Sequence, residues 1–177
     1  MRKTAGIIIL FLVVVAAVYF ITGLYRNARS DEPPLPAELD VTLYFANQEY
    51  VTTGNEELAK VLPVSRTVQT GGSKDKLAAA VLDELREPPP GGGLTTALHT
   101  DLKITGVRVE GETVLVDFSP ENLHGGSLEE ILLVRQIVKT LTGLVDIEEV
   151  QFLVNGERRD TLMGHIGTHD PLRREDI

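Results

Sequence analysis

The sequence predicts an α+β protein in which an N-terminal transmembrane helix carries one small domain. Residues 5–25 form an apolar run without a charged side chain, and later segments show both the two-residue alternation of strands and the spacing of amphipathic helices. Beyond the apolar run and a linker, roughly 140 residues remain, enough for one hydrophobic core. We therefore predict an anchor over residues 1–26, a linker over 27–38 and one domain over 39–177.

The apolar run is long enough to cross a bilayer. At 1.5 Å per residue a helix over 5–25 spans about 30 Å, whereas the apolar part of a signal peptide has roughly 7–15 residues. Ala16 and Ala17 could mark a cleavage site, but the apolar residues 18–21 follow them directly. An uncleaved anchor is thus favoured, with a cleaved signal peptide or a buried core helix as the alternatives.

The flanks of this run set the expected topology. Arg2 and Lys3 precede it and Arg26 and Arg29 follow it, so the positive-inside rule gives only a small bias. A very short N-terminal tail is easily retained, so we expect a single-pass protein of the cell membrane with an extracytoplasmic C-terminal domain. Three prolines among residues 27–38 predict a stiff, extended tether.

Charge and cysteine content exclude several classes of function. All 26 acidic residues follow Ser30, and residues 30–177 carry a formal charge of 13 − 26 = −13. Such a surface repels phosphates, so we do not expect nucleic-acid binding. The chain has no cysteine, which excludes disulfides, thiolate metal sites and an N-terminal lipidated cysteine. The apolar helix is then the one anchor that the sequence offers.

The first half of the domain predicts strands followed by a helix. Residues 40–45 alternate as a half-buried strand, 50–52 and 66–69 are short strand candidates, and 56–61 are weakly helical or loop. Ser73 is a good N-cap for a helix that ends before Pro88. Its apolar stripe is Leu77, Val81 and Leu85. A glycine run at 91–93 follows prolines and is interpreted as a loop, because a phosphate cradle would lead from a strand into a helix.

Residues 103–118 form the clearest hairpin. A two-residue turn at Gly111-Glu112 pairs Val109 with Val114 and Val107 with Val116, which places all four on one face. Glycine at the first turn position fits a type II′ turn.

A second helix is predicted from Ser127, with Glu130 completing a capping box. At 100° per residue, most of its apolar side chains share one arc: Ile131, Val134, Ile137, Val138, Leu141 and Val145. Leu132 falls among the polar residues opposite, beside Gln136 and Lys139. An exposed leucine there indicates a contact surface, so Leu132, Gln136 and Lys139 are the candidate interaction residues.

The last part of the chain predicts a strand over 149–154 and a type I′ turn at Asn155-Gly156. Residues 157–162 would return as an exposed edge strand, and the tail from Gly164 would be loop.

Catalytic and metal-binding patterns are weak. His165 and His169 are four residues apart, but Gly164, Gly167 and Pro171 disfavour the helix that would bring them together. Ser119 precedes Pro120 and lacks the glycines of a nucleophile elbow. We predict no catalytic residue, metal ligand or cofactor, and no enzyme.

Several motifs together resemble the GerMN (Germane) domain of sporulation, spore-germination and other bacterial envelope proteins. They are LYF at Leu43, the run Val107–Ser119, VKTLT at Val138, VQFLVNG at Val150 and GHIGTHDPL at Gly164. The resemblance covers residues 39–173. It implies a non-enzymatic, extracytoplasmic two-layer domain of βαββα type, with two helices on one face of a mixed or antiparallel sheet. Members are often lipoproteins and can carry two tandem copies, whereas this chain has no cysteine and room for one.

The resulting functional hypothesis is a membrane-anchored, non-enzymatic interaction or scaffold domain in a sporulation, germination or cell-envelope assembly. Its partner would be an envelope protein or a second copy of the chain. The alternative is a module that binds the cell wall (peptidoglycan or another glycan), which requires an exposed aromatic platform. Tyr44, Tyr50 and Phe45 are the candidates for that platform. An enzyme would need converging polar groups, for example near His165 and Asp117.

Overall fold

The structure is a computed structural model that describes residues 34–177, of which Leu35–Ile177 form one compact unit. The predicted anchor over residues 1–26 and the linker up to residue 33 lie outside the described residues. Within residues 34–177, no helix has the length and hydropathy needed to cross a membrane.

The first sheet is built on β1 (Glu38–Asn47), which pairs antiparallel with β2 (Val61–Gln69) and, at its end, with β3 (Leu94–Thr95). The predicted strand over 40–45 is confirmed and longer than expected. The strand candidate at 50–52 is wrong, because these residues belong to helix α2 (Gln48–Thr53). The side chain of Asn47 caps α2 by accepting the backbone N–H of Glu49 at 3.0 Å.

The second sheet has the order β4-β5-β6-β7, with β4 (Ile104–Glu110), β5 (Thr113–Phe118), β6 (Glu149–Val154) and β7 (Leu172–Arg173). The predicted hairpin register is confirmed in both valine pairs. Gly111 has a φ of 64°, whereas Glu112 is not among the residues with positive φ, which fits the type II′ turn. Strands β5 and β6 are parallel, and α4 (Ser127–Leu141) is the crossover between them.

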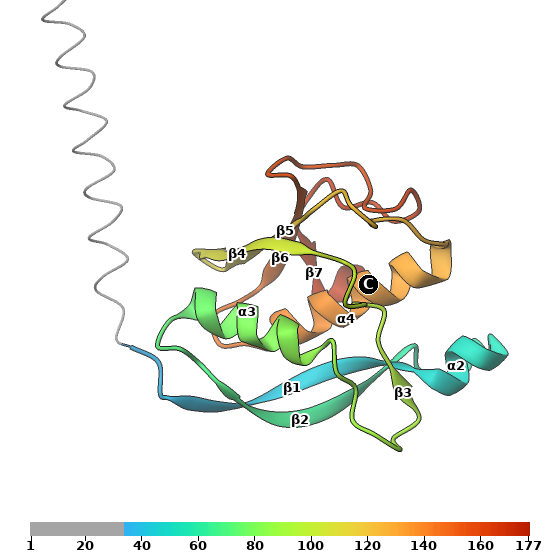
Figure 1. The fold of residues 1–177 in the computed structure, drawn as a ribbon, viewed down its shortest axis with the longest axis horizontal. Coiled ribbons are helices and arrows are strands. Elements are labelled where there is room, and N and C mark those ends of the chain that lie inside the picture. Colours follow the sequence, from blue (N-terminus) through green and yellow to red (C-terminus); the bar gives the residue numbers. More distant parts are fainter. Residues whose placement is uncertain (1–33) are drawn as a thin grey trace, which may run out of the picture. The chain divides into compact units, whose positions relative to one another are not determined.

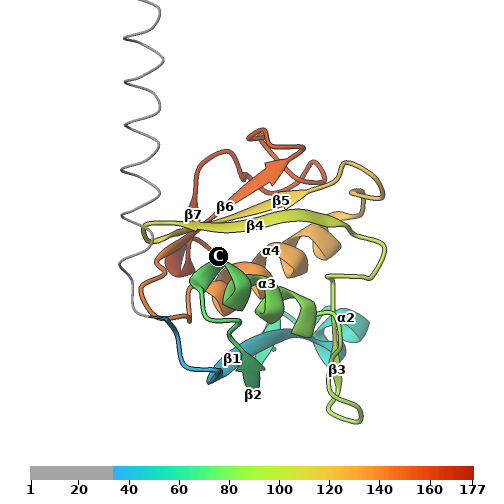
Figure 2. The same cartoon turned by 60° about the vertical axis from the view of Figure 1, so that its left-hand side comes forward.

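Helix α3 (Lys74–Glu84) and α4 lie between the two sheets, as Figures 1 and 2 show. The predicted arrangement, one sheet with both helices on one face, is therefore wrong: there are two sheets with the helices between them. The reason is the side chains of α4, of which nine from Glu130 to Leu141 are buried. A helix that is buried around most of its circumference needs cover on more than one side.

The core between these layers is continuous. Phe45 of β1, Phe118 of β5 and Phe152 of β6 are each at most 1% exposed, and the rings of Phe118 and Phe152 lie 6.4 Å apart between centroids. The predicted stripe of α3 is buried, and Ser73 caps the helix by accepting the N–H of Lys76. Burial of large side chains of this kind contributes about 2 kcal/mol each.

The predicted capping box of α4 is wrong. Its N-cap is Gly126, which has no side chain to offer, and Glu130 turns into the interior instead. The Glu130 carboxylate is fully buried and accepts three backbone N–H groups from the C-terminal loop. Leu162 and Met163 donate to Oε1 at 2.9 and 2.8 Å, and His165 donates to Oε2 at 2.7 Å. Three charge-assisted bonds outweigh one helix cap.

The end of the chain follows the prediction only as far as its turn. Asn155 and Gly156 have φ values of 58° and 80°, as a type I′ turn requires. The return strand over 157–162 is wrong, because Glu157 and Thr161 form only isolated bridges and β6 pairs with β7 instead. The loop between them is held by Glu130, which replaces the expected ladder of hydrogen bonds.

The candidate interaction residues also need correction. Leu132 is 4% exposed and Gln136 is fully buried, so neither can contact a partner. The Gln136 side chain instead accepts the N–H of Ala97 at 2.7 Å. Lys139 is half-buried and keeps access to solvent. The assignment failed because a helical projection assumes one buried face, whereas α4 is covered by both sheets.

Replacing Glu130 with Gln should lower the free energy of unfolding by about 3 kcal/mol, because the amide removes the charge and turns its NH₂ group toward backbone donors. Urea denaturation of the full chain measures this, and amide exchange at Leu162, Met163 and His165 should accelerate. Glu129→Gln is the matched control, since Glu129 is half-buried and binds no backbone donor of that loop. Equal destabilisation by both variants would contradict the anchoring role of Glu130.

Leu132→Asp should destabilise the whole domain by at least about 3 kcal/mol, because it removes apolar contacts and buries a carboxyl group without a partner. Thermal unfolding followed by circular dichroism checks this. Leu128→Asp, at an exposed position one turn earlier on the same helix, should leave the melting temperature nearly unchanged. A Leu132→Asp protein that melts like the wild type would show that this side of α4 is accessible after all.

Candidate functional site

From Glu130 to its end at Leu141, the accessible residues of α4 form a single stripe. Ile131, Arg135 and Lys139 recur every four residues and are half-buried, while the residues between them are buried. A cleft of about 180 Å³ runs beside the first half of this stripe. It is lined by Lys60, Ile131, Val134, Arg135, Ile166, Asp176 and Ile177. We call this the α4 cleft, and its walls come from α4, the start of β2 and the C-terminal segment.

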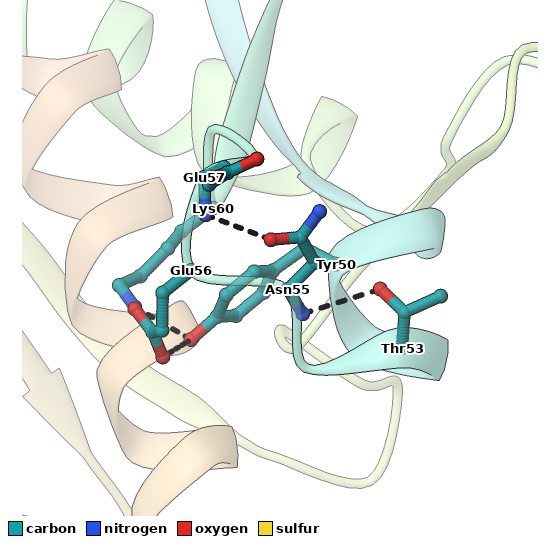
Figure 3. Close-up of polar contacts among 6 residues, drawn as sticks. All are labelled: Tyr50, Thr53, Asn55, Glu56, Glu57 and Lys60. Atoms are coloured by element: carbon teal, nitrogen blue, oxygen red, sulfur yellow. Dashed lines mark hydrogen bonds and ion pairs between the residues drawn. The ribbon is translucent and has the colours of Figure 1, made fainter.

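One wall of the α4 cleft is fixed by a cluster at the end of α2, shown in Figure 3. The Tyr50 hydroxyl donates to Glu56 Oε1 at 3.0 Å, and Lys60 Nζ lies 2.5 Å from both the Tyr50 hydroxyl and Glu56 Oε2. Lys60 Nζ also lies 4.3 Å from the centroid of the Tyr50 ring, within cation–π range. The hydrogen bond from Lys60 lowers the pKa of Glu56, and the same bond raises the pKa of Lys60.

The loop between Tyr50 and Lys60 is held by local hydrogen bonds. Gly54 ends α2 with a φ of 65°, and the side chain of Asn55 accepts the N–H of Glu57 at 3.0 Å. Lys60 then joins the first sheet, because its carbonyl accepts the N–H of Asn47 at 2.9 Å. Lys60 is therefore placed by the sheet and oriented by Tyr50 and Glu56.

The far end of the stripe carries a second aromatic cluster. The Tyr44 ring has Lys139 Nζ 5.8 Å and Arg174 Cζ 5.1 Å from its centroid. Arg174 belongs to the 3₁₀ helix η1 (Arg174–Asp176) and donates to the Tyr44 hydroxyl at 3.3 Å and to the Lys139 carbonyl at 2.5 Å. Tyr44 and α4 are also joined directly, since the Tyr44 N–H donates to Thr140 Oγ1 at 2.9 Å.

The half-buried cations of residues 34–177 differ in their partners. Four of them are paired with carboxylates: Lys60 with Glu56, Arg66 with Glu84, Lys74 with Asp146 and Arg86 with Asp83. The other two, Arg135 and Lys139, have no carboxylate within ion-pair distance, and both lie on the α4 stripe. A partly desolvated guanidinium is well suited to bidentate binding of a carboxylate.

The aromatic residues considered for a glycan platform are mostly unavailable. Tyr50 is 4% exposed and Phe45 is fully buried, so the prediction of an exposed platform is wrong for both. The Tyr44 ring is accessible only in part and is contacted by two cationic side chains. A sugar ring stacks on a bare aromatic face, which none of the three offers.

The polar residues considered for catalysis have structural roles. Asp117 Oδ1 accepts the N–H of Gly156 at 2.9 Å, and Ser119 Oγ accepts the N–H of Glu121 at 3.2 Å. His165 and His169 lie in the C-terminal loop, where His165 Nε2 is 3.4 Å from the Gly125 carbonyl. In residues 34–177, no group of three or more His, Cys, Asp or Glu side chains could hold a metal ion.

Of the predicted interaction residues, only Lys139 belongs to the accessible stripe. The helical projection placed Ile131 in the buried arc, which is wrong, and it did not single out Lys60 or Arg135. Arg135 carried a usable signal, because it is the one cation among the apolar residues at the centre of α4. Ile131 and Lys60 carried none, since their positions depend on which side of α4 stays uncovered.

The solved structures similar to this chain have the same fold. The first GerMN domain of the sporulation protein GerM from Bacillus subtilis matches with a TM-score of 0.58 and 22% identity, over 78% of this chain and 99% of that one. The tandem GerMN domains of the same protein match with a TM-score of 0.54 and 23% identity, over 78% of this chain and 45% of that one. A candidate lipoprotein from Clostridium perfringens matches with a TM-score of 0.55 and 23% identity, over 82% and 94% of the two chains.

None of the curated proteins compared with this sequence matches it. The family model described as "Germane: Sporulation and spore germination" matches residues 42–160, from the middle of β1 to beyond β6. That span contains α3, α4 and all strands of both sheets except the start of β1 and the short β7. The order of motifs, the match to the family model and the shared fold agree, and the chain belongs to the Germane (GerMN) family.

Proposed function

We propose that this protein is a membrane-tethered, extracytoplasmic and non-enzymatic interaction module that acts in a sporulation, germination or cell-envelope assembly. Family membership supports the biological setting, and the apolar run over residues 5–25 supports the tether. The tether also favours an assembly role, because fixing a domain at the membrane raises its effective concentration near other membrane-bound proteins.

The observation that carries the interaction role is the α4 cleft with its adjoining stripe. It combines an apolar floor with two cations that have no carboxylate partner among the described residues. Elsewhere, the half-buried cations of residues 34–177 are satisfied within the domain. A surface that combines apolar side chains with cations that lack an ion-pair partner is better suited to protein recognition than to catalysis.

A glycan-binding role has less support. The three aromatic residues that could stack on a sugar are buried or covered by cations. We therefore retain protein recognition as the proposed function.

The topology can be tested by cysteine labelling, because the chain has no cysteine of its own. Glu157→Cys lies at an exposed turn and should react with a membrane-impermeant maleimide on intact cells. Lys3→Cys, on the other side of the apolar run, should react only after lysis. The reverse labelling pattern would contradict an extracytoplasmic domain.

The interaction role can be tested by photocrosslinking the full chain in its native membranes. Benzoylphenylalanine in place of Ile131, at the edge of the α4 cleft, should give a discrete adduct with an envelope protein or with a second copy. The same group in place of Arg158, in the exposed loop after β6, is the control and should give little adduct. Equal adducts at both positions, or none at Ile131, would contradict a contact surface at the cleft.

A further inference from the structure

We propose that the α4 cleft and stripe bind an extended acidic peptide segment of a partner protein, in which a branched aliphatic residue and two carboxylates occupy alternate positions and so face the same side. This inference rests on the proposed function and adds the chemistry of the partner. The carboxylates would pair with Arg135 and Lys139, and the aliphatic side chain would enter the cleft between Ile131, Val134 and Ile166.

Two cations of the stripe form no ion pair among the described residues. Arg135 and Lys139 are half-buried, so each has lost part of its hydration, and neither forms an ion pair with a carboxylate of the described residues. The pKa of Glu56 is lowered chiefly by its hydrogen bond from Lys60 and only in a smaller part by the charge of Arg135. The nearby acidic groups are already engaged: Glu56 binds Lys60 and Tyr50, and Asp176 Oδ2 accepts the N–H of Arg173 at 2.8 Å. A carboxylate from outside the domain is the group that this surface lacks.

The remaining cations reinforce the local field. Lys60 lines the cleft, and Arg174 lies beside Lys139 at the Tyr44 ring. Four cationic side chains thus follow the open side of α4, although residues 34–177 as a whole carry 13 basic and 24 acidic side chains, a formal charge of 13 − 24 = −11. This grouping of cations, two of them without an ion pair, favours anionic groups at the stripe.

The spacing of the cations fits an extended segment. Arg135 and Lys139 are one helical turn apart, a rise of about 6 Å along α4. Alternate residues of an extended chain are about 6.6 Å apart and point to the same side. Carboxylates two residues apart can therefore reach both cations. The residue two positions beyond the carboxylate that binds Arg135 lies on the same side and supplies the aliphatic side chain, for which the cleft of about 180 Å³ beside Ile131 has room.

The overall charge favours a peptide over an anionic membrane. A membrane is a wide surface, and it would bring the many acidic side chains around the stripe close to its own negative charge. A single peptide segment touches only the cleft and the stripe. At physiological salt the Debye length is about 8 Å, so more distant acidic groups repel a narrow ligand weakly.

The test uses the full chain, purified in a mild neutral detergent, and fluorescein-labelled peptides. The probe contains Ile-Gly-Asp-Gly-Asp-Gly-Ile, in which either chain direction can place an isoleucine at the cleft, and its matched partner has Asn in place of both Asp residues. Fluorescence anisotropy should show binding of the acidic probe, and weaker binding as salt is raised. The double variant Arg135→Gln with Lys139→Gln should weaken binding about tenfold or more, the loss expected for charge-assisted hydrogen bonds.

The control is the double variant Arg158→Gln with Arg159→Gln, which removes the same charge from an exposed loop and should leave binding nearly unchanged. Ile131→Ala should reduce the preference for the acidic probe over a probe in which both isoleucines are replaced by glycine. Circular dichroism of each variant establishes that it is folded. If the Arg135→Gln, Lys139→Gln double variant is folded and still binds the probe as tightly as the wild type, the proposal is overturned.

Other results would overturn it as well. These are equal weakening by both double variants, equal binding of the neutral peptide, or no binding of the acidic probe at millimolar concentration. Cosedimentation with anionic vesicles that depends on Arg135 and Lys139 would assign the surface to lipid. Loss of a dimer in the same variant would assign it to a second copy. A failure of peptide binding would not change the results of the labelling and crosslinking experiments. The acidic-peptide proposal can therefore be wrong while the proposed interaction role is right.

Discussion

The position of α4 between two sheets is the constraint on which the rest of the structure depends. Because β5 and β6 are parallel neighbours, the chain must cross over between them, and α4 makes that crossover on one face of the sheet. The β1–β2 ribbon then covers the helix from the other side (Figure 2). Beyond its first turn, most side chains of α4 are interior, and the accessible surface is reduced to one residue per turn at Ile131, Arg135 and Lys139.

Because α4 is buried on both sides, its polar side chains form hydrogen bonds with other segments of the domain. Glu130 holds the C-terminal loop, Gln136 binds the backbone at Ala97, and Thr140 binds the backbone of Tyr44. Each of these groups satisfies a backbone donor that would otherwise be buried without a partner. The polar residues of this helix therefore divide into two kinds. The buried ones join distant segments of the domain, and the cations of the stripe remain available to a partner.

The cations of the stripe are half-buried in a domain that is acidic as a whole. A half-buried guanidinium or ammonium without a carboxylate is costly unless another group compensates for the lost hydration. In this domain the compensation for Lys60 comes from Glu56 and Tyr50, and for Lys139 in part from the Tyr44 ring. Arg135 forms neither an ion pair nor a cation–π contact among the described residues, and the nearby Glu56 carboxylate is already bound to Lys60 and Tyr50. The centre of the stripe is therefore where a carboxylate from outside would be bound most favourably.

The sequence by itself determined the elements whose signals are local: the 103–118 hairpin with its register, the cap at Ser73, β6 and the turn at Asn155. The alternation of apolar and polar residues in a strand, and a turn with positive φ, depend only on neighbouring residues. They can therefore be predicted without knowing how the elements pack. Only the tertiary structure decided which side of α4 faces solvent, because that depends on a second sheet formed by residues far away in the chain. For the same reason the helical projection predicts Leu132 and Gln136 to be exposed, although both are buried. The same reason also explains why Glu130 does not cap its own helix but binds a loop more than thirty residues later in the chain.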